Sequence, residues 1–292
     1  MHLFAGTLLQ GFVRGCVIAL LAAGVTLVYR SARVLNFAQG GLATLNTYVY
    51  YQLSVAWSLP AAAALPLALV VAAGVGVVAE FVSVRPLLRA DFQSRSVGSI
   101  GALLILQWAV LAAWGSQLRV LPSIWRGSVT LGGVVITGQD VAIVLATAIV
   151  GIGLALALTR TRSGLAIAAI AQDRDAARLL GVRPRAVSIA TFALASVLAA
   201  IAGILATPLL LLNPFQMTLV FVVALGASLA GGFDSLPRTI GAGIVLGIIQ
   251  SLVSTYVPVA NLPQAAGFLA VLVALAVARR RGNLVDLLRG SA

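Results

Sequence analysis

The side chains that most often catalyse reactions or bind metals are scarce in this chain. All 19 basic residues are arginine, and the single histidine, His2, follows Met1. Without lysine, neither a phosphate-binding loop of the G-x-x-x-x-G-K-[ST] type nor a Schiff-base enzyme is possible. One cysteine, Cys16, and one histidine cannot form an intramolecular disulfide or a His/Cys metal cluster. We therefore expect no catalytic residue, no metal and no cofactor.

The composition places the chain in a lipid bilayer. Of its 292 residues, 61% are hydrophobic and 9% are charged, with a mean hydropathy of +1.09. Soluble domains average about 45 to 50% apolar and about 25% charged residues. The elements that position any functional residue should therefore be membrane-spanning helices.

Nine apolar segments are candidate spans, because a helix needs about 20 residues to cross the hydrocarbon core. They are residues 7–29, 41–55, 59–84, 98–115, 141–158, 186–212, 216–231, 239–257 and 262–278. Two of them, 41–55 and 216–231, are short, so each is expected to be tilted, broken or re-entrant. The sequence predicts an all-α, polytopic bundle of about eight or nine transmembrane helices, forming one domain over 1–292. Glycine and alanine at spacings of four, as at Gly11 and Gly15 and at Gly243 and Gly247, predict close helix packing.

The arginines predict the orientation of these spans. With nine alternating crossings, 16 arginines fall on one side, Arg119 and Arg126 fall on the other, and Arg14 lies within the first span. Basic residues in short loops stay on the cytoplasmic side. The N-terminus is therefore expected outside and the C-terminus in the cytoplasm. The formal charge of +12 reflects this topology, and no nucleic acid is expected as a partner.

Charged groups inside the spans bear on how transport is energised. An ion-coupled transporter usually keeps Asp, Glu or His within its spans. Glu80 is the one acidic residue expected there, close before Arg85 at the cytoplasmic end of its helix, and we favour a structural anchor over a proton relay. Arg14 is placed near an end of its span, where its long side chain can reach the interface. The chain thus has no evident means of energising transport by itself.

A polar interruption at 160–184 separates two clear spans and is predicted to form a cytoplasmic helix of its own. Ser163 is a plausible N-cap, 164–180 favours a helix, and Gly181 with Pro184 would end it. One stripe of this helix carries small and apolar residues together with one aspartate, at Ala169, Asp173, Ala176, Ala177 and Leu180. Such a stripe suits docking into a groove of another protein, with a merely interfacial helix as the alternative.

The most polar stretch expected inside the membrane is 36–52, a candidate lining for a substrate pathway. Its polar residues include Asn36, Gln39, Thr44, Asn46, Thr47 and Tyr48. Facing lipid would be costly for these side chains, so they should face protein or water. Hydrogen bonding between helices explains each of them equally well. Asn213 and Gln216 form a second, weaker candidate near the outer side.

Four segments, in the same order along the chain, resemble the permease subunits of ABC importers in the branched-chain amino acid family. They are VLNFAQG at 34–40, Glu80 with Arg85, Pro86, Leu87 and Arg89, GLAIAAIAQDRDAARLLG at 164–181, and the glycine-rich run at 229–247. The third resembles that family's cytoplasmic coupling segment, with Gly164 at its start and Asp173, Ala177 and Gly181 at recurrent positions. Gln39 stands where the family usually has histidine.

The resemblance implies a multi-pass subunit of the bacterial cytoplasmic membrane that is not itself an enzyme. Its implied partners are two ATPase subunits, a second permease that is a paralogue or the same chain, and an extracytoplasmic binding protein. The family carries branched-chain amino acids, other amino acids, amides and urea. From the residues alone, a passive channel or an ion-coupled secondary transporter for a small solute such as urea or an amide remains an alternative.

Overall fold

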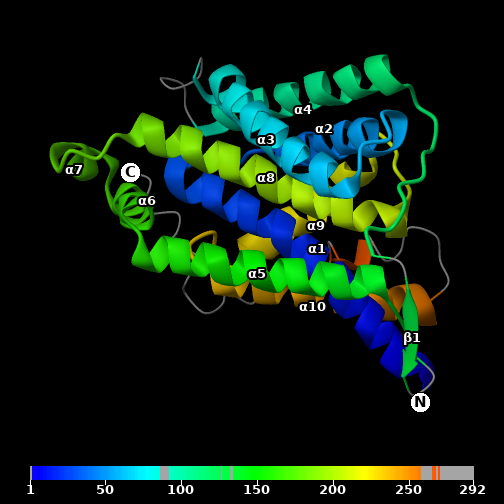
Figure 1. Cartoon of the computed structure of the whole chain (residues 1–292). Helices are drawn as coiled ribbons and strands as arrows, with labels where there is room; N and C mark the ends of the chain where they lie inside the picture. The colour runs from blue at the N-terminus through cyan, green and yellow to red at the C-terminus, as the bar shows by residue number, and fades with distance from the viewer. Residues whose placement is uncertain are drawn as a thin grey trace.

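The computed structural model describes residues 2–85, 92–125, 127–131, 134–257, 265–267 and 269. Helices dominate this part of the chain, which confirms the predicted fold class (Figure 1). In chain order the elements are α1 (His2–Ala32), α2 (Gln39–Tyr51), the π-helix η1 (Gln52–Ala56), α3 (Ala61–Ala79), the π-helix η2 (Glu80–Val84), α4 (Phe92–Trp114), β1 (Ser128–Leu131), β2 (Val134–Thr137), α5 (Gly138–Arg160), α6 (Arg162–Gln172), α7 (Arg174–Leu179), α8 (Pro184–Leu210), α9 (Gln216–Ala230) and α10 (Leu236–Tyr256).

Six of the described helices are long and apolar enough to cross a membrane: α1, α3, α4, α5, α8 and α10. The two segments predicted to be short are short, because α9 has 15 residues and α2 has 13 before it continues into η1. The ninth predicted span, 262–278, lies outside the described residues except for 265–267 and 269. The chain is a multi-pass membrane protein.

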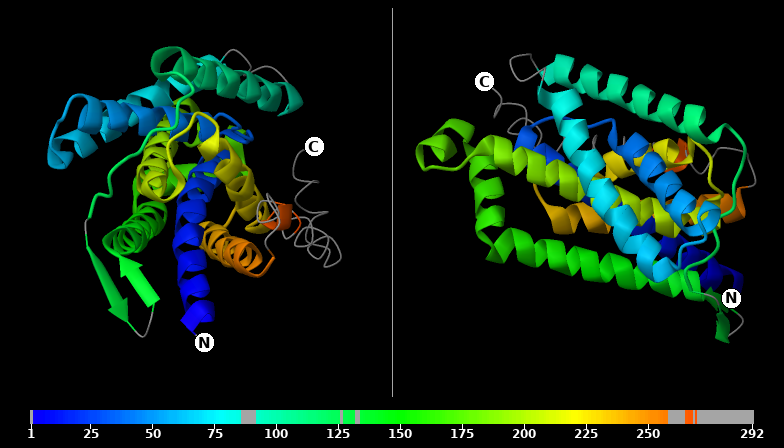
Figure 2. Two further views of the ribbon diagram at one scale, coloured as in Figure 1. Left: turned by 90° about the vertical axis from the view of Figure 1, so that its right-hand side faces the viewer. Right: turned by 45° about the horizontal axis from the view of Figure 1, so that its top comes forward.

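The helices form three layers, and the middle layer contains α1 and α8 (Figures 1 and 2). In Figure 1, α2, α3 and α4 lie above α8 and α1, and α5 and α10 lie below them. In the most apolar stretch of each helix, 89% of the residues of α1 and 67% of those of α8 are buried, against 17% for α4 and for α5. α1 and α8 are therefore the core, and α4 and α5 present most of their surface to the surroundings.

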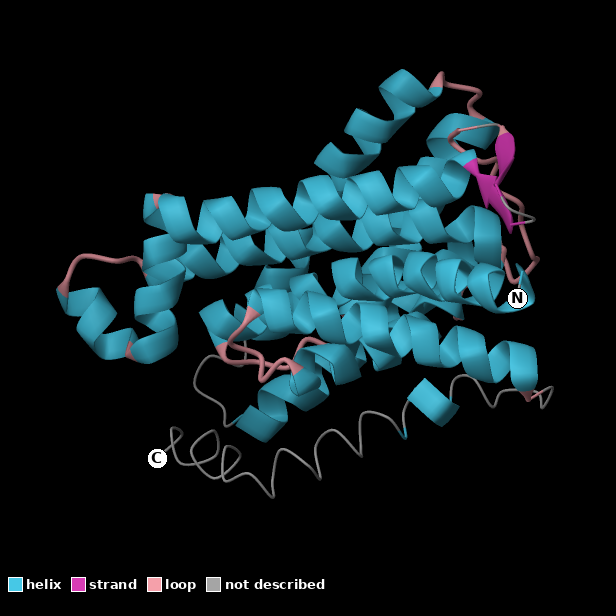
Figure 3. Ribbon diagram, turned by 90° about the horizontal axis from the view of Figure 1, so that it is seen from below, coloured by secondary structure: helices cyan, strands magenta, loops and turns pink. Residues whose placement is uncertain are grey.

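The two ends of the bundle differ in structure. At one end α6 and α7 project beyond the bundle, and at the other β1 and β2 form an antiparallel hairpin with Ser128 opposite Thr137 (Figure 3). The hairpin lies between two predicted spans, in a segment for which the sequence predicted only a loop. It leads directly into α5, whose N-cap Thr137 and third residue Asp140 form a reciprocal capping box.

Glycines bring α1 and α10 into backbone contact. A Cβ atom on Gly15 would lie 2.6 Å from the Cα of Ile244, and one on Gly243 would lie 2.8 Å from the Cα of Ala19. Gly247 packs on the backbone of Gly15 in the same way. Small residues are what lets helices approach closely in a bilayer, where dispersion and hydrogen bonds hold the helices together. The packing predicted from the glycine spacing is confirmed.

We predict that Gly243→Ala lowers the free energy of unfolding by about 1 to 3 kcal/mol, because the new methyl group meets helix backbone that cannot rotate away. Gly241→Ala in the same helix is the matched control, since nothing lies within 4 Å of its added Cβ. Thermal unfolding of both variants in detergent measures the difference. Equal melting temperatures for the two variants would contradict the close α1–α10 contact.

Candidate functional site

The segment predicted as one cytoplasmic helix, 164–180, is two helices, which corrects the sequence-based prediction. α6 ends at Gln172, Asp173 adopts an extended conformation (φ −148°, ψ 115°), and α7 begins at Arg174. The N-cap of α6 is Thr161, whose Oγ1 accepts a hydrogen bond from the amide of Gly164 at 3.1 Å, and not the predicted Ser163. Spacing arguments missed the break because a single capping aspartate, without Gly or Pro, causes it.

Asp173 holds the junction between α6 and α7. Its Oδ1 accepts hydrogen bonds from the amides of Asp175 at 2.8 Å and Ala176 at 3.0 Å. These amides belong to the first turn of α7 and have no partner within the helix. The aspartate at this position therefore acts as an N-cap, and its carboxylate is exposed.

Two glycines shape the ends of this unit. Gly181 has φ +85°, and α7 closes with hydrogen bonds from Gly181 to the carbonyl of Arg178 and from Val182 to the carbonyl of Ala177. This is the Schellman arrangement, which favours glycine at the left-handed position. At the other end, a Cβ on Gly164 would collide with the carbonyl oxygens of Ala157 and Leu158. The structure thus explains why glycine suits both Gly164 and Gly181, which the sequence predicted as coupling residues.

Burial divides the predicted docking stripe. Ala177 is only 2% exposed, at the place where α7 meets α8, so it holds the unit together rather than offering a surface. Ala169 is half-buried, while Ala176 is exposed. Leu180 is 82% exposed and its neighbour Leu179, which the stripe did not include, is 90% exposed. The surface free to contact another protein is therefore centred on the two leucines at the C-terminal end of α7.

Arg174, the first residue of α7, adds a positive charge to this unit. Its pKa is lowered from the ordinary value, mainly by burial and further by the like charges of Arg178 and Arg95. The exposed pair of Arg178 with Asp175, 2.9 Å apart, offsets only part of this charge. The buried Nε of Arg174 has no hydrogen-bond partner. An acidic group on a docking partner would stabilise this arrangement.

The polar residues of the predicted substrate pathway all lie inside the chain. None of Asn36, Gln39, Thr44, Asn46, Thr47 and Tyr48 is more than 2% exposed. Gln39 Nε2 donates to the carbonyl of Ala195 at 2.8 Å, and Asn46 Nδ2 donates to the hydroxyl of Ser196 at 2.9 Å. Both acceptors belong to α8, so these two amides bind α2 to the core helix.

Some of the remaining polar groups of this stretch are used locally, whereas the buried Asn36 Nδ2, Gln39 Oε1, Asn46 Oδ1 and Tyr48 hydroxyl have no described hydrogen-bond partner. Thr44 and Thr47 donate to carbonyls of their own helix, and Asn36 Oδ1 accepts from the amide of Ala38, next to the first turn of α2. Tyr48 packs on Trp114 with ring centroids 5.4 Å apart. None of the six predicted residues lines either of the two pockets described below. Bonds between helices thus come from Gln39 and Asn46, and the lining of a pathway by this stretch stays a prediction.

Glu80 is buried at the start of η2, with 4% of its surface exposed. Its described partner is the hydroxyl of Ser188 on α8, which donates to Oε1 at 3.2 Å. This contact fits the anchoring role favoured from the sequence, because it ties α3 to the core helix.

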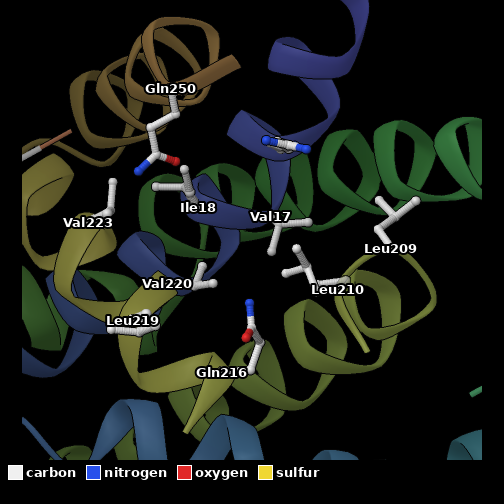
Figure 4. A pocket seen from close by; sticks show the side chains of 11 residues that line it. Val17, Ile18, Leu209, Leu210, Gln216, Leu219, Val220, Val223 and Gln250 are labelled. Atoms are coloured by element: carbon white, nitrogen blue, oxygen red, sulfur yellow. The ribbon is translucent and has the colours of Figure 1, made fainter. Parts of the chain in front are cut away.

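A pocket of about 110 Å³, which we call the inner pocket, lies between α1, α8, α9 and α10 (Figure 4). Its walls are aliphatic, and its polar members are Arg14, Gln216 and Gln250. The amides of Gln216 and Gln250 enter it from α9 and α10. Gln216, the weaker candidate from the sequence, accepts a hydrogen bond from Asn213 Nδ2 at 3.1 Å. Gln250 was missed, although a carboxamide in an apolar span is itself a signal.

A second, larger pocket of about 440 Å³, the hairpin-end pocket, lies between the start of α1, β2 and the end of α10. Its polar lining comprises Thr7, Gln10, Arg14, Ser251, Ser254 and Thr255. Arg14 lines both pockets. α1 begins at His2, so Arg14 lies 12 residues inside the helix, about 18 Å from its start.

Long apolar helices with polar side chains buried between them define a multi-pass membrane protein. The family described as "Branched-chain amino acid transport system / permease component" matches residues 7–278. The chain belongs to this family, and its members are transport subunits rather than enzymes.

Individual relatives agree with the family. The chain is 29% identical to the high-affinity branched-chain amino acid transport system permease protein LivH of Escherichia coli, with 87% of each chain covered. It is 28% identical to the corresponding protein BraD of Pseudomonas aeruginosa, with 84% of each chain covered. Among solved structures, PsaBC from Streptococcus pneumoniae in complex with Fab has a chain with a TM-score of 0.50 at 12% identity, over 92% of this chain and 89% of that one. This last likeness concerns the fold.

We predict that Asp173→Ala weakens α7 while Asp173→Asn preserves it, because asparagine caps a helix as well as aspartate does. Loss of the cap should cost about 1 kcal/mol, which speeds amide hydrogen exchange across Arg174–Leu179 roughly fivefold. Hydrogen exchange with mass spectrometry measures this. If the asparagine variant exchanges as fast as the alanine variant, the charge of Asp173 matters and the cap does not.

Proposed function

We propose that this chain is the membrane-spanning subunit of an ATP-driven importer of branched-chain or chemically similar amino acids, and that it moves substrate by alternating access. It sits in the bacterial cytoplasmic membrane with its C-terminus in the cytoplasm. Family membership and the names of the relatives support the substrate class. The single observation that carries the mechanism is the two-helix unit formed by α6 and α7.

This unit is suited to transmit force from a partner. Two exposed leucines at the end of α7, with the exposed Leu165 of α6 in the same projection, form apolar surface that water disfavours. α6 follows α5 after one residue, Thr161, and α7 connects to the core helix α8 through residues 180–183. With caps on both helices and so little slack, a push on α7 moves α5 and α8 directly.

The energy for transport comes from other subunits in this proposal. The chain has no lysine for a phosphate loop, and its one buried intramembrane glutamate is bonded to a serine hydroxyl. Two ATPase subunits would supply the energy, an extracytoplasmic binding protein would deliver substrate, and a second permease, this chain again or a paralogue, would complete the pathway. A passive channel has no use for a docking unit, so capture of the ATPases separates the two classes.

We predict that Leu180→Asp weakens capture of the ATPase subunits by at least about 2 kcal/mol, or roughly thirtyfold in affinity, because a charge replaces a buried apolar anchor. Leu118→Asp is the matched control: Leu118 is 66% exposed, but it lies towards the opposite end, between α4 and the hairpin. Quantitative pull-down from membranes expressing all subunits measures capture. Undiminished capture with Leu180→Asp would leave α6 and α7 as interfacial helices.

The orientation is tested by cysteine labelling in a Cys16→Ser background. Ser123 and Ser163 are both exposed, Ser123 before the hairpin and Ser163 in α6. An impermeant maleimide should label Ser123→Cys in intact cells and Ser163→Cys only after permeabilisation. The Cys16→Ser parent should stay unlabelled. Labelling of both positions from the same side would contradict the proposed topology.

A further inference from the structure

Arg14 lies where the inner pocket meets the hairpin-end pocket. It is the one residue that lines both of them. The hairpin-end pocket has hydroxyl and amide groups in its lining, whereas the inner pocket has aliphatic walls such as Val17, Leu210 and Val220. Both pockets expose more apolar than polar surface, and a solute moving from one to the other would pass this guanidinium group.

The guanidinium of Arg14 has no protein partner in the part of the chain that the structure describes. It makes no hydrogen bond or ion pair with any described residue, and no carboxylate lines either pocket. The Arg14 side chain is exposed at the surface of the chain, and lipid beside it would make a free guanidinium costly. α1 is about 46 Å long against a hydrocarbon thickness of about 30 Å, so a centred helix places Arg14 about 10 Å inside the boundary. An arginine at such a depth is functional by default.

The inner pocket offers groups that complement an amino acid zwitterion. A guanidinium presents a planar fork of donors that matches a carboxylate. The amide nitrogen of Gln216 is a further donor, and the amide of Gln250 has no described hydrogen-bond partner and can accept from an ammonium group. The aliphatic walls suit a branched side chain. One water molecule needs about 10 to 15 Å³ of such a pocket. The inner pocket, of about 110 Å³, therefore holds roughly seven to eleven groups of the size of a water molecule, which is comparable with the non-hydrogen atoms of an aliphatic amino acid.

We infer that Arg14, with Gln216 and Gln250, forms a transient binding site for the substrate in transit, in which the guanidinium holds the α-carboxylate and the inner pocket holds the aliphatic side chain. This inference rests on the proposed function and deepens it. It names the group that selects amino acids over amines and uncharged amides. The site opens at the chain surface, since Leu209 is 40% and Leu219 is 51% exposed.

The test measures occupancy of the inner pocket in the assembled complex, reconstituted in phosphatidylcholine nanodiscs. A Val220→Cys variant in the Cys16→Ser background reports on the pocket through its rate of maleimide labelling. Millimolar leucine and 4-methylpentanoate, which keeps the carboxylate, should slow labelling. 3-Methylbutylamine, which lacks the carboxylate, should not. Adding Arg14→Gln should abolish the protection, and Ser123→Cys should show none.

Uptake gives an independent measure. Arg14→Gln should lower leucine uptake at least about tenfold, because a desolvated carboxylate loses its charged partner, while capture of the ATPases is unchanged. Arg14→Lys should restore only part, since ammonium lacks the planar fork. Arg238→Gln, an exposed arginine in the first turn of α10, should leave uptake unchanged.

The outcomes separate this site from the proposed function. ATP-dependent uptake without leucine protection of Val220→Cys would overturn the inference and leave the importer intact. Protection that follows the content of phosphatidylglycerol instead of leucine would make Arg14 a headgroup anchor and also overturn it. Leucine protection in a complex that shows no ATP-dependent uptake would keep the site and remove the importer.

Discussion

The absence of water from the hydrocarbon core is the constraint on which the rest of this structure depends. Every polar group there must find a partner within the protein. The constraint explains why Gln39 and Asn46 turn towards α8 and why the buried Glu80 meets a serine hydroxyl. Some groups remain without a described protein partner, among them the guanidinium of Arg14, Gln39 Oε1 and Asn46 Oδ1. Polar residues in the bundle thus include those bonded across helices, those bonded within their own helix and those without a described partner.

Close packing between helices follows from the same apolar environment. Lipid tails are as apolar as leucine, so burial of apolar side chains does little to hold helices together in a bilayer. Backbone contact through Gly15, Gly243 and Gly247 supplies dispersion over a large area and joins α1 to α10. α8 also packs on α1, so the core helices are in direct contact with the helices around the inner pocket.

The unit of α6 and α7 obeys different rules because it lies beyond the apolar helices. There, capping by Thr161 and Asp173 and the left-handed Gly181 fix the backbone, and exposure of Leu179 and Leu180 is costly in water. The proposed coupling to an ATPase rests on this projection, which has exposed leucines at its tip and is joined to α5 and α8. The inner pocket lies within the bundle, bounded by α8, so the two regions share a core helix.

The sequence by itself predicted the lipid environment and the spans that the structure describes, because these depend on composition and segment length. It also predicted the side of the membrane expected for each loop and, through the order of its motifs, the family. It also marked Gln216 as a polar group near the outer side. Only the tertiary structure decided which polar residues are bonded across helices and which line a pocket. The amides of α2 and those of α9 and α10 look alike in the chain, but their environments depend on which helices lie beside them. Arg14, Gln216 and Gln250 come together from three helices, and Asp173 breaks a helical pattern through a local hydrogen bond. The spacing of residues along the chain predicts neither the assembly of this pocket nor the helix break at Asp173.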